Sequence, residues 1–171
     1  MAPDSPPLIR RARPADAAAI ADVHVRAWQA AYEHVFGAER LATLDTAQRE
    51  QRWRRALETG GQAGFVADRD GVVVGWATVG PSRDVATSGE LYGIYVAPEA
   101  WGAGAGPALL RAAVDELCTQ GYGDAVLWVL ADNPRARRFY EREGWTSDGR
   151  RRTGEHLGVR TDEIGYRIAL R

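Results

Sequence analysis

Three glycines at alternate positions most strongly constrain what this chain can fold into. Gly102, Gly104 and Gly106 lie in the stretch WGAGAG (101–106), between an apolar, strand-like segment and a helix-like segment that begins at Pro107. Without side chains, the main chain can turn tightly and another group can approach it closely. The first amides of a helix lack internal acceptors, and the helix dipole adds roughly half a positive charge there. The stretch therefore predicts a turn that can bind an anion such as a phosphate.

The spacing of the glycines distinguishes between known kinds of phosphate-binding motif. The pattern is GxGxG rather than GxGxxG, it follows several strands, and no acidic residue ends a following strand about 20 residues on, which disfavours a dinucleotide-binding Rossmann unit. The absence of Gly-Lys-Ser/Thr excludes a P-loop. Two interpretations remain: a tight turn that binds nothing, and a site for a pyrophosphate-bearing cofactor of another kind.

The remainder of the chain alternates strand-like and helix-like patterns, which predicts one mixed α/β domain over residues 1–171. Asp16 is expected to cap the first helix, and Asp45 opens a capping-box segment ahead of the second. Asp70-Gly71 predicts a hairpin turn. The expected order is β-α-α-β-β-β-α-β-α-β-β, with strands at 8–11, on both sides of the hairpin turn, at 90–96, at 125–130 and twice after Trp145, the last near 163–170, and with helices after Pro14, after Asp45, over 107–120 and after Asn133.

Composition excludes several classes of protein. A chain of 171 residues can bury a core without disulfides or metals. A net charge of −1 gives no general attraction to nucleic acid or to an anionic membrane. Cys118 is the single cysteine, which excludes an intrachain disulfide framework, and His24, His34 and His156 show no metal-ligand spacing. The segment MAPDSPPLIRR lacks the apolar core of a signal peptide, and no 18-residue apolar run is present, so we expect a soluble, cytoplasmic protein.

Two stretches, ELYGIYVAPEAWGAGAGPALL (90–110) and LWVLADNPRARRFYEREGW (127–145), together resemble two motifs of the GNAT superfamily of acyl-CoA-dependent N-acetyltransferases. In ELYGIYVAPEAWGAGAGPALL (90–110), Gly104 and Gly106 fill the glycine positions of the motif Gln/Arg-x-x-Gly-x-Gly/Ala, and Gly102 matches a frequent extra glycine. The stretch departs from the motif at Trp101, where the family usually has Gln or Arg. A second departure is the proline after Gly106, which removes one amide that could reach a phosphate.

The second motif, Asn-x-x-Ala-x-x-Phe-Tyr-x-x-x-Gly-Phe, lies in LWVLADNPRARRFYEREGW (127–145). Its positions are filled by Asn133, Ala136, Phe139, Tyr140 and Gly144, with Trp145 in place of the last Phe. The resemblance implies a GNAT-like single domain with a mixed sheet whose two central strands splay apart.

The resemblance also implies acetyl-CoA as the acyl donor and a set of residues that hold it. The pantetheine arm is expected between the strands 90–96 and 125–130, beside the backbone of Tyr95 and Val96, with Asn133 bonded to the arm or to a nearby water. One of Arg111, Arg137 and Arg138 is expected to neutralise the 3′-phosphate, and Arg138 is our choice. The pyrophosphate is expected on the amides of Trp101, Gly102, Ala103, Gly104, Ala105 and Gly106.

Acyl transfer to an amine sets demands on side chains. The amine, with a pKa around 10.4, must lose a proton, and the leaving thiolate, with a pKa near 8.5, benefits from a proton donor. Tyr140 is the candidate acid. Glu90, acting directly or through water, is the candidate base, and Glu163 is a second possibility. The oxyanion donor is expected to be a backbone N–H near Val96.

The acceptor is less constrained. His24, Trp28 and Tyr32 recur at helical spacing, which fits core packing or an aromatic pocket for an apolar or cationic acceptor; Trp128 has the same two interpretations. The expected acceptor is a primary amine of a small molecule or peptide, attracted by acids such as Asp84 or those at 162–163. A non-catalytic acyl-CoA-binding or sensing domain of the same fold is the alternative function. Because family members are often dimers, the resemblance is also compatible with a homodimer.

Overall fold

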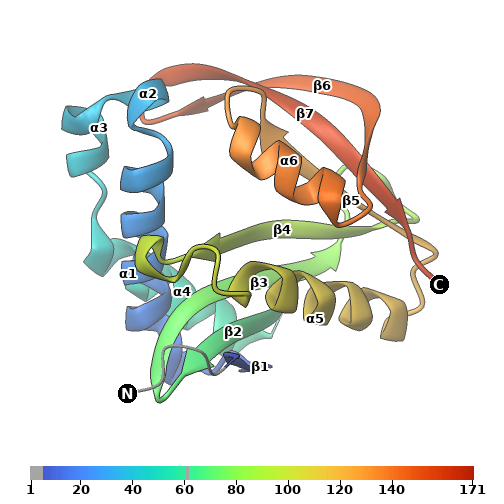
Figure 1. Ribbon diagram of the computed structural model, residues 1–171, viewed down its shortest axis with the longest axis horizontal. Coiled ribbons are helices and arrows are strands. Elements are labelled where there is room, and N and C mark those ends of the chain that lie inside the picture. Colours follow the sequence, from blue (N-terminus) through green and yellow to red (C-terminus); the bar gives the residue numbers. More distant parts are fainter. Residues whose placement is uncertain (1–5, 61) are drawn as a thin grey trace.

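The computed structural model describes residues 6–60 and 62–171. Residues 1–5, which begin the segment MAPDSPPLIRR, lie outside the described residues. Seven strands form one sheet in the order β1-β2-β3-β4-β5-β7-β6, flanked by helices (Figure 1). The elements are β1 (Leu8–Arg11), α1 (Ala17–Ala31), α2 (Glu33–Phe36), α3 (Ala38–Ala42), α4 (Thr46–Thr59), β2 (Ala63–Arg69), β3 (Val72–Pro81), β4 (Gly89–Val96), α5 (Ala105–Thr119), β5 (Asp124–Leu130), α6 (Pro134–Arg142), β6 (Thr146–His156) and β7 (Val159–Ala169), with 3₁₀ turns at Pro14–Asp16 and Pro98–Ala100.

The predicted mixed α/β fold is confirmed, with two local corrections. The short helices α2 and α3 were not expected, because four- and five-residue helices are too short to show a readable apolar period. Asp16 does not cap α1: its carboxylate accepts hydrogen bonds from the Arg10 guanidinium at 2.9 Å and from the Arg13 backbone at 2.7 Å. Asp45 does cap α4, with its side chain accepting from the Gln48 amide at 3.0 Å.

Helices cover both faces of the sheet. The α1 and α4 helices pack on the face that carries Val66 and Trp76. The α5 and α6 helices lie on the opposite face, against Ala67 and Ala77 from β2 and β3 and against Tyr166 from β7. Among the described residues, no helix has both the length and the apolar character needed to cross a membrane.

The predicted splay of the two central strands is confirmed. The parallel strands β4 and β5 pair only at Gly89 with Ala125 and at Glu90 with Val126, whereas β5 stays paired with β7 as far as Leu130. A register shift against β3 leaves Tyr92 as an extra residue in β4. Beyond Glu90, the two strands therefore diverge, and the free edge of β4 faces an opening in the middle of the sheet.

Two glycines bring α5 close to this opening. A β-carbon on Gly89 would lie 2.7 Å from a methyl group of Leu117, and one on Gly75 would lie 2.9 Å from a methyl group of Leu109. Such distances are too short for a real contact, so α5 can pack here only against bare backbone. This packing fixes the N-terminus of α5 beside the end of β4. The helix starts at Ala105, two residues before the expected Pro107.

Candidate active site

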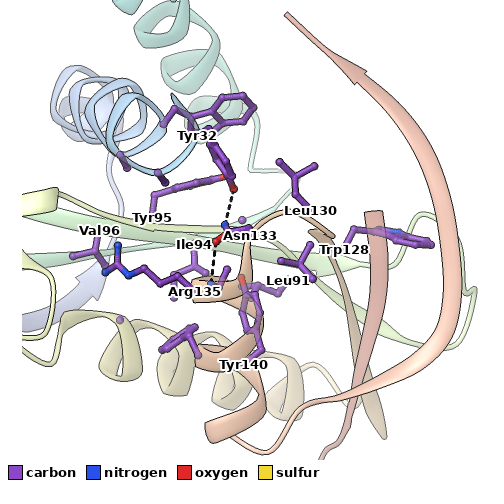
Figure 2. A pocket seen from close by; sticks show the side chains of 18 of the residues that line it. Tyr32, Leu91, Ile94, Tyr95, Val96, Trp128, Leu130, Asn133, Arg135 and Tyr140 are labelled. Atoms are coloured by element: carbon purple, nitrogen blue, oxygen red, sulfur yellow. Dashed lines mark hydrogen bonds between the residues drawn. The ribbon is translucent and has the colours of Figure 1, made fainter. Parts of the chain in front are cut away.

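A pocket of about 820 Å³ lies where β4 and β5 diverge, between α1, α6 and the N-terminus of α5 (Figure 2). It joins the two sequence motifs, which are separated along the chain by most of α5 and by β5. Ala103 and Ala105 are the two expected residues that do not line it. The expected residues that do line it are Glu90, Tyr95, Val96, Trp101, Gly102, Gly104, Gly106, Asn133, Arg138 and Tyr140.

The glycine turn presents bare main chain to this pocket. Gly102 and Gly104 have positive φ values of 78° and 84°, a conformation that side chains disfavour, and a β-carbon on either would meet no atom of the described residues within 4 Å. In the described structure, the amides of Gly102, Gly104, Ala105 and Gly106 have no hydrogen-bond acceptor. Four free donors at the start of a 15-residue helix make a cradle that suits a pyrophosphate.

Trp101, the departure from the motif, connects this turn to the neighbouring elements. Its indole N–H donates a hydrogen bond of 2.8 Å to the carbonyl oxygen of Val96, at the end of β4. The guanidinium of Arg135, on α6, lies 3.4 Å from the centre of the Trp101 ring. Burial lowers the pKa of Arg135 from its usual value. The Trp101 side chain thus holds the glycine turn against β4 and holds a cation at the pocket wall.

Asn133 and Tyr140 lie at opposite ends of α6 and both reach the pocket (Figure 2). The Asn133 oxygen accepts from the Ala136 amide at 3.0 Å and so caps the helix, while its amide nitrogen donates to the Tyr32 hydroxyl at 3.2 Å. The Tyr140 side chain is buried, and burial, with a smaller effect of Tyr32, raises the pKa of its phenol above the usual value. Tyr140 is therefore a protonated phenol at neutral pH.

Glu90 is fully buried at the narrow end of the splay. One carboxylate oxygen accepts from the Arg83 guanidinium at 2.5 and 3.1 Å, and the other accepts from the Arg83 backbone amide at 2.9 Å. Glu163, on β7, also lines the pocket; it pairs with Arg152, and its other oxygen lies 3.6 Å from the His156 ring nitrogen. Both candidate bases are thus present, each with an arginine partner.

The family model described as the Acetyltransferase (GNAT) family matches residues 19–145. This chain belongs to the GNAT family of acetyltransferases.

Relatives of this GNAT chain match along almost its whole length. The N-acetyltransferase YuaI of Bacillus subtilis is 34% identical over 163 residues, which cover 92% of this chain and 90% of YuaI. The structure of yncA from Salmonella typhimurium, solved with acetyl-CoA, is 28% identical with a TM-score of 0.73, covering 98% of this chain and 95% of that one. The paiA N-acetyltransferase of Thermoplasma acidophilum, solved with coenzyme A, has a TM-score of 0.75 at 17% identity over 95% of this chain and 98% of that one, which shows the shared fold.

The arginines of the GNAT pocket differ partly from expectation. Arg138 lines the pocket together with Arg135 and Arg142. Arg137 turns away from it and donates to the Tyr166 hydroxyl and to the Ala131 carbonyl at 3.3 and 3.4 Å. Arg111 is not part of the lining. No sequence pattern marked Arg135, because its place over Trp101 depends on how α6 packs beside the glycine turn.

The aromatic residues His24, Trp28 and Tyr32 of α1 form one wall of the GNAT pocket, and their rings also pack against one another. Trp28 lies between His24 and Tyr32, with ring centres 5.7 and 5.0 Å apart, and Tyr95 stacks on His24 at 5.2 Å. Tyr32 is a core residue, yet all four rings line the pocket. The two interpretations of this stripe therefore both hold, because the core of α1 is also the pocket wall.

Trp128 lines the pocket, whereas Asp84 and Asp162, which were expected to attract the acceptor, are not part of its lining. The Trp128 indole N–H donates to Asp84 at 2.6 Å, and the guanidinium groups of Arg150 and Arg152 lie 4.7 and 4.3 Å from the centre of its ring. Asp162 accepts from the Thr153 hydroxyl at 3.3 Å and is not part of the pocket lining.

His24 should make stability depend on pH in a measurable way. Burial, and then the charges of Arg49 and Arg52, lower the pKa of His24 from 6.5 to about 3. Below pH 6.5, His24 therefore binds a proton in the unfolded chain but not in the folded chain. The free energy of unfolding falls as the pH falls. The expected loss from this group is about 1.4 kcal/mol per pH unit between the two pKa values.

The measurement is urea unfolding of the wild type and of His24→Gln at several values between pH 4 and pH 7. Carboxylates titrate in both proteins and cancel in the difference. The wild type should lose stability more steeply than the variant as the pH falls. Parallel curves would contradict a histidine that is held neutral.

Proposed function

We propose that this GNAT chain transfers an acetyl group from acetyl-CoA to a primary amine of a small molecule or peptide. The observation that carries the proposal is the cradle formed by the free amides of Gly102, Gly104, Ala105 and Gly106, which opens on the same pocket as the buried phenol of Tyr140. The curated relatives named as N-acetyltransferases, and the solved neighbours that contain acetyl-CoA or coenzyme A, support it.

The chain offers partners along the length of this donor. The free amides suit the pyrophosphate, and Arg138, with Arg135 and Arg142 on the same helix, offers positive charge to the 3′-phosphate. The free edge of β4 around Tyr95 and Val96 offers main-chain groups to the pantetheine arm. The Val96 carbonyl already accepts from the Trp101 indole, but a carbonyl oxygen has two lone pairs and can accept a second bond. Acetyl-CoA would supply an acyl group activated as a thioester.

Tyr140 is proposed as the general acid. In the described structure its hydroxyl has no hydrogen-bond partner, so its proton is free for donation to the departing thiolate. Burial keeps the phenol protonated until that charge develops. A backbone N–H on the free edge of β4, near Val96, is proposed as the donor to the oxyanion.

Glu90 is proposed as the group that takes the proton from the amine, directly or through water. A carboxylate has about four lone-pair positions, and Arg83 uses three of them, so one remains for a water or the amine. Glu163, which lines the same pocket beside His156, is the alternative.

Replacement by glutamine distinguishes the two bases. Glu90→Gln is expected to lower kcat by about 10²-fold, the lower part of the range for a general base, and to shift the acidic limb of the pH–rate profile. Glu163→Gln is expected to leave that limb in place. A shift produced by Glu163→Gln alone would transfer the role to Glu163. The readout is kcat/KM against pH for both variants and the wild type.

The function itself is tested with purified protein, acetyl-CoA and a panel of amines. Release of free coenzyme A thiol and an acetylated product in the mass spectrum are the expected results. Binding of acetyl-CoA by calorimetry, without turnover of any amine, would favour the alternative of an acyl-CoA-sensing domain. Failure to bind acetyl-CoA at all would contradict both.

A further inference from the structure

A second pocket of about 290 Å³ adjoins the first, and His24 lines both. None of the described residues that line it is acidic. It lies between α1 and α4, on the face of the sheet opposite to α5, so it is separate from the glycine turn and its phosphate cradle. Its lining residues are His24, Arg49, Arg52, Trp53, Ala56 and Gln62.

The two arginines of this pocket have no acidic partner among the described residues. Arg49 and Arg52 are three residues apart on α4, so both charges lie on one helix face. Within the described part of the chain, neither guanidinium forms a salt bridge or a hydrogen bond. The same helix does provide acids elsewhere, since Arg54 pairs with Glu50 at 2.9 Å. The pocket therefore concentrates positive charge that the fold leaves uncompensated.

Buried polar atoms point to the same need for a partner. The Nε of Arg49 and the Nδ1 of His24 are both buried without a hydrogen-bond partner among the described residues, as is the indole nitrogen of Trp28. The Arg49 guanidinium lies 6.0 Å from the centre of the Trp28 ring, which lines the main pocket. Burial and the neighbouring charge of Arg52 lower the pKa of Arg49. A bound anion would accept from the Arg49 Nε–H and offset the repulsion between the two cations.

We propose that Arg49 and Arg52 bind an anionic group, carboxylate or phosphate, of the amine acceptor, which lies across His24 and Trp28 with its amine in the main pocket. This inference rests on the proposed acetyltransferase function and narrows its acceptor to amines that also carry an acid. The rings of His24 and Trp28 then contact the body of the acceptor, and the two arginines fix its position by binding its anionic group.

Matched acceptors test the proposal. Phenylalanine is compared with phenylalaninamide, and O-phosphoethanolamine with ethanolamine, so that a carboxylate and a phosphate are each removed without loss of the amine. The protein variants are Arg49→Gln/Arg52→Gln and the control Arg54→Gln, which removes a positive charge from the same helix outside the pocket. Since a carboxamide also alters the amine's own reactivity, the decisive quantity is the change in KM between wild type and variant.

The double variant is expected to raise KM for the anionic member of one pair by about ten- to a hundredfold, and to leave KM for its neutral partner unchanged. Arg54→Gln should change neither. The pair that responds identifies carboxylate or phosphate as the anion. Equal changes for anionic and neutral acceptors, or the same changes with Arg54→Gln, would overturn the proposal.

A binding measurement separates this proposal from the proposed function. N-acetylphenylalanine and its amide, together with O-phosphoethanolamine and ethanolamine, are titrated into the wild type and the double variant by calorimetry, and the His24 ring signals are followed by NMR. Anion-selective binding that disturbs His24 and disappears in the double variant is expected. If it occurs without turnover of any amine, the catalytic function fails while the anion site stands. If no anion binds selectively, the site fails whatever the turnover.

Discussion

Replacement of Tyr140 by phenylalanine is expected to lower kcat by about 10²–10⁴-fold, the range typical of a lost general acid, while the Kd for acetyl-CoA stays near its wild-type value. The reason is that Phe keeps the buried ring and its packing against Trp145 and removes a hydroxyl that bonds to nothing in the described structure. Stopped-flow or steady-state thiol release gives kcat, and calorimetry gives the affinity for the donor.

Tyr166→Phe is the matched control for this change. Tyr166 is a buried tyrosine of the same core, with its ring centre 6.4 Å from that of Tyr140, but its hydroxyl donates to Glu141 and accepts from Arg137. Loss of that hydroxyl should cost about 1 kcal/mol of stability and little activity. If Tyr140→Phe retained full kcat, or if the two variants lost activity equally, Tyr140 would not be the proton donor.

The second large effect is expected at the glycine turn. Gly104→Ala should weaken acetyl-CoA binding by about ten- to a hundredfold, equivalent to about 1.4–2.8 kcal/mol. A β-carbon at this position projects into the open space before the free amides, where the pyrophosphate is proposed to lie, so it would hold the phosphates away from their donors. The φ of 84° adds strain of about 1–2 kcal/mol for any residue with a side chain.

Gly121→Ala separates loss of binding from strain. Gly121 follows the other end of the same helix, with a φ of 88°, and an added β-carbon would have no atom of the described part of the chain within 4 Å. Both variants should lose similar stability in thermal unfolding, and only Gly104→Ala should lose affinity for acetyl-CoA in calorimetry. Equal affinities in the two variants would show that the turn does not hold the donor.

Local features of the fold and of the site could be predicted from the sequence. The Asp70-Gly71 pair forms the predicted hairpin turn, with φ values of 53° and 84°, and Asn133 caps the predicted helix. The turn at Gly102 and Gly104 lies between a strand and a helix as expected. These features depend on backbone conformations within a few residues, and such conformations follow from residue type.

Contacts between elements that are far apart in the sequence could not be predicted from it. The sequence marked Glu90 but did not reveal that Arg83 occupies most of its carboxylate, and it marked Trp101 as a loss of polarity when its indole bonds to β4 and supports Arg135. Asp16 has a residue type and position that suit a cap, yet the approach of Arg10 from β1 determines its role.

The sequence alone determined the order of the strands and of the longer helices, the glycine turn, the helix caps at Asp45 and Asn133 and the two motifs, because each depends on short-range geometry and on apolar periods along the chain. Only the tertiary structure decided which charges are compensated and which are free. The divergence of β4 from β5 opens the pocket, the packing of α6 places Tyr140 in it, and the packing of α4 against α1 brings Arg49 to His24. Those contacts depend on the directions in which the sheet and its helices carry side chains that are far apart along the chain, and no local pattern encodes such directions.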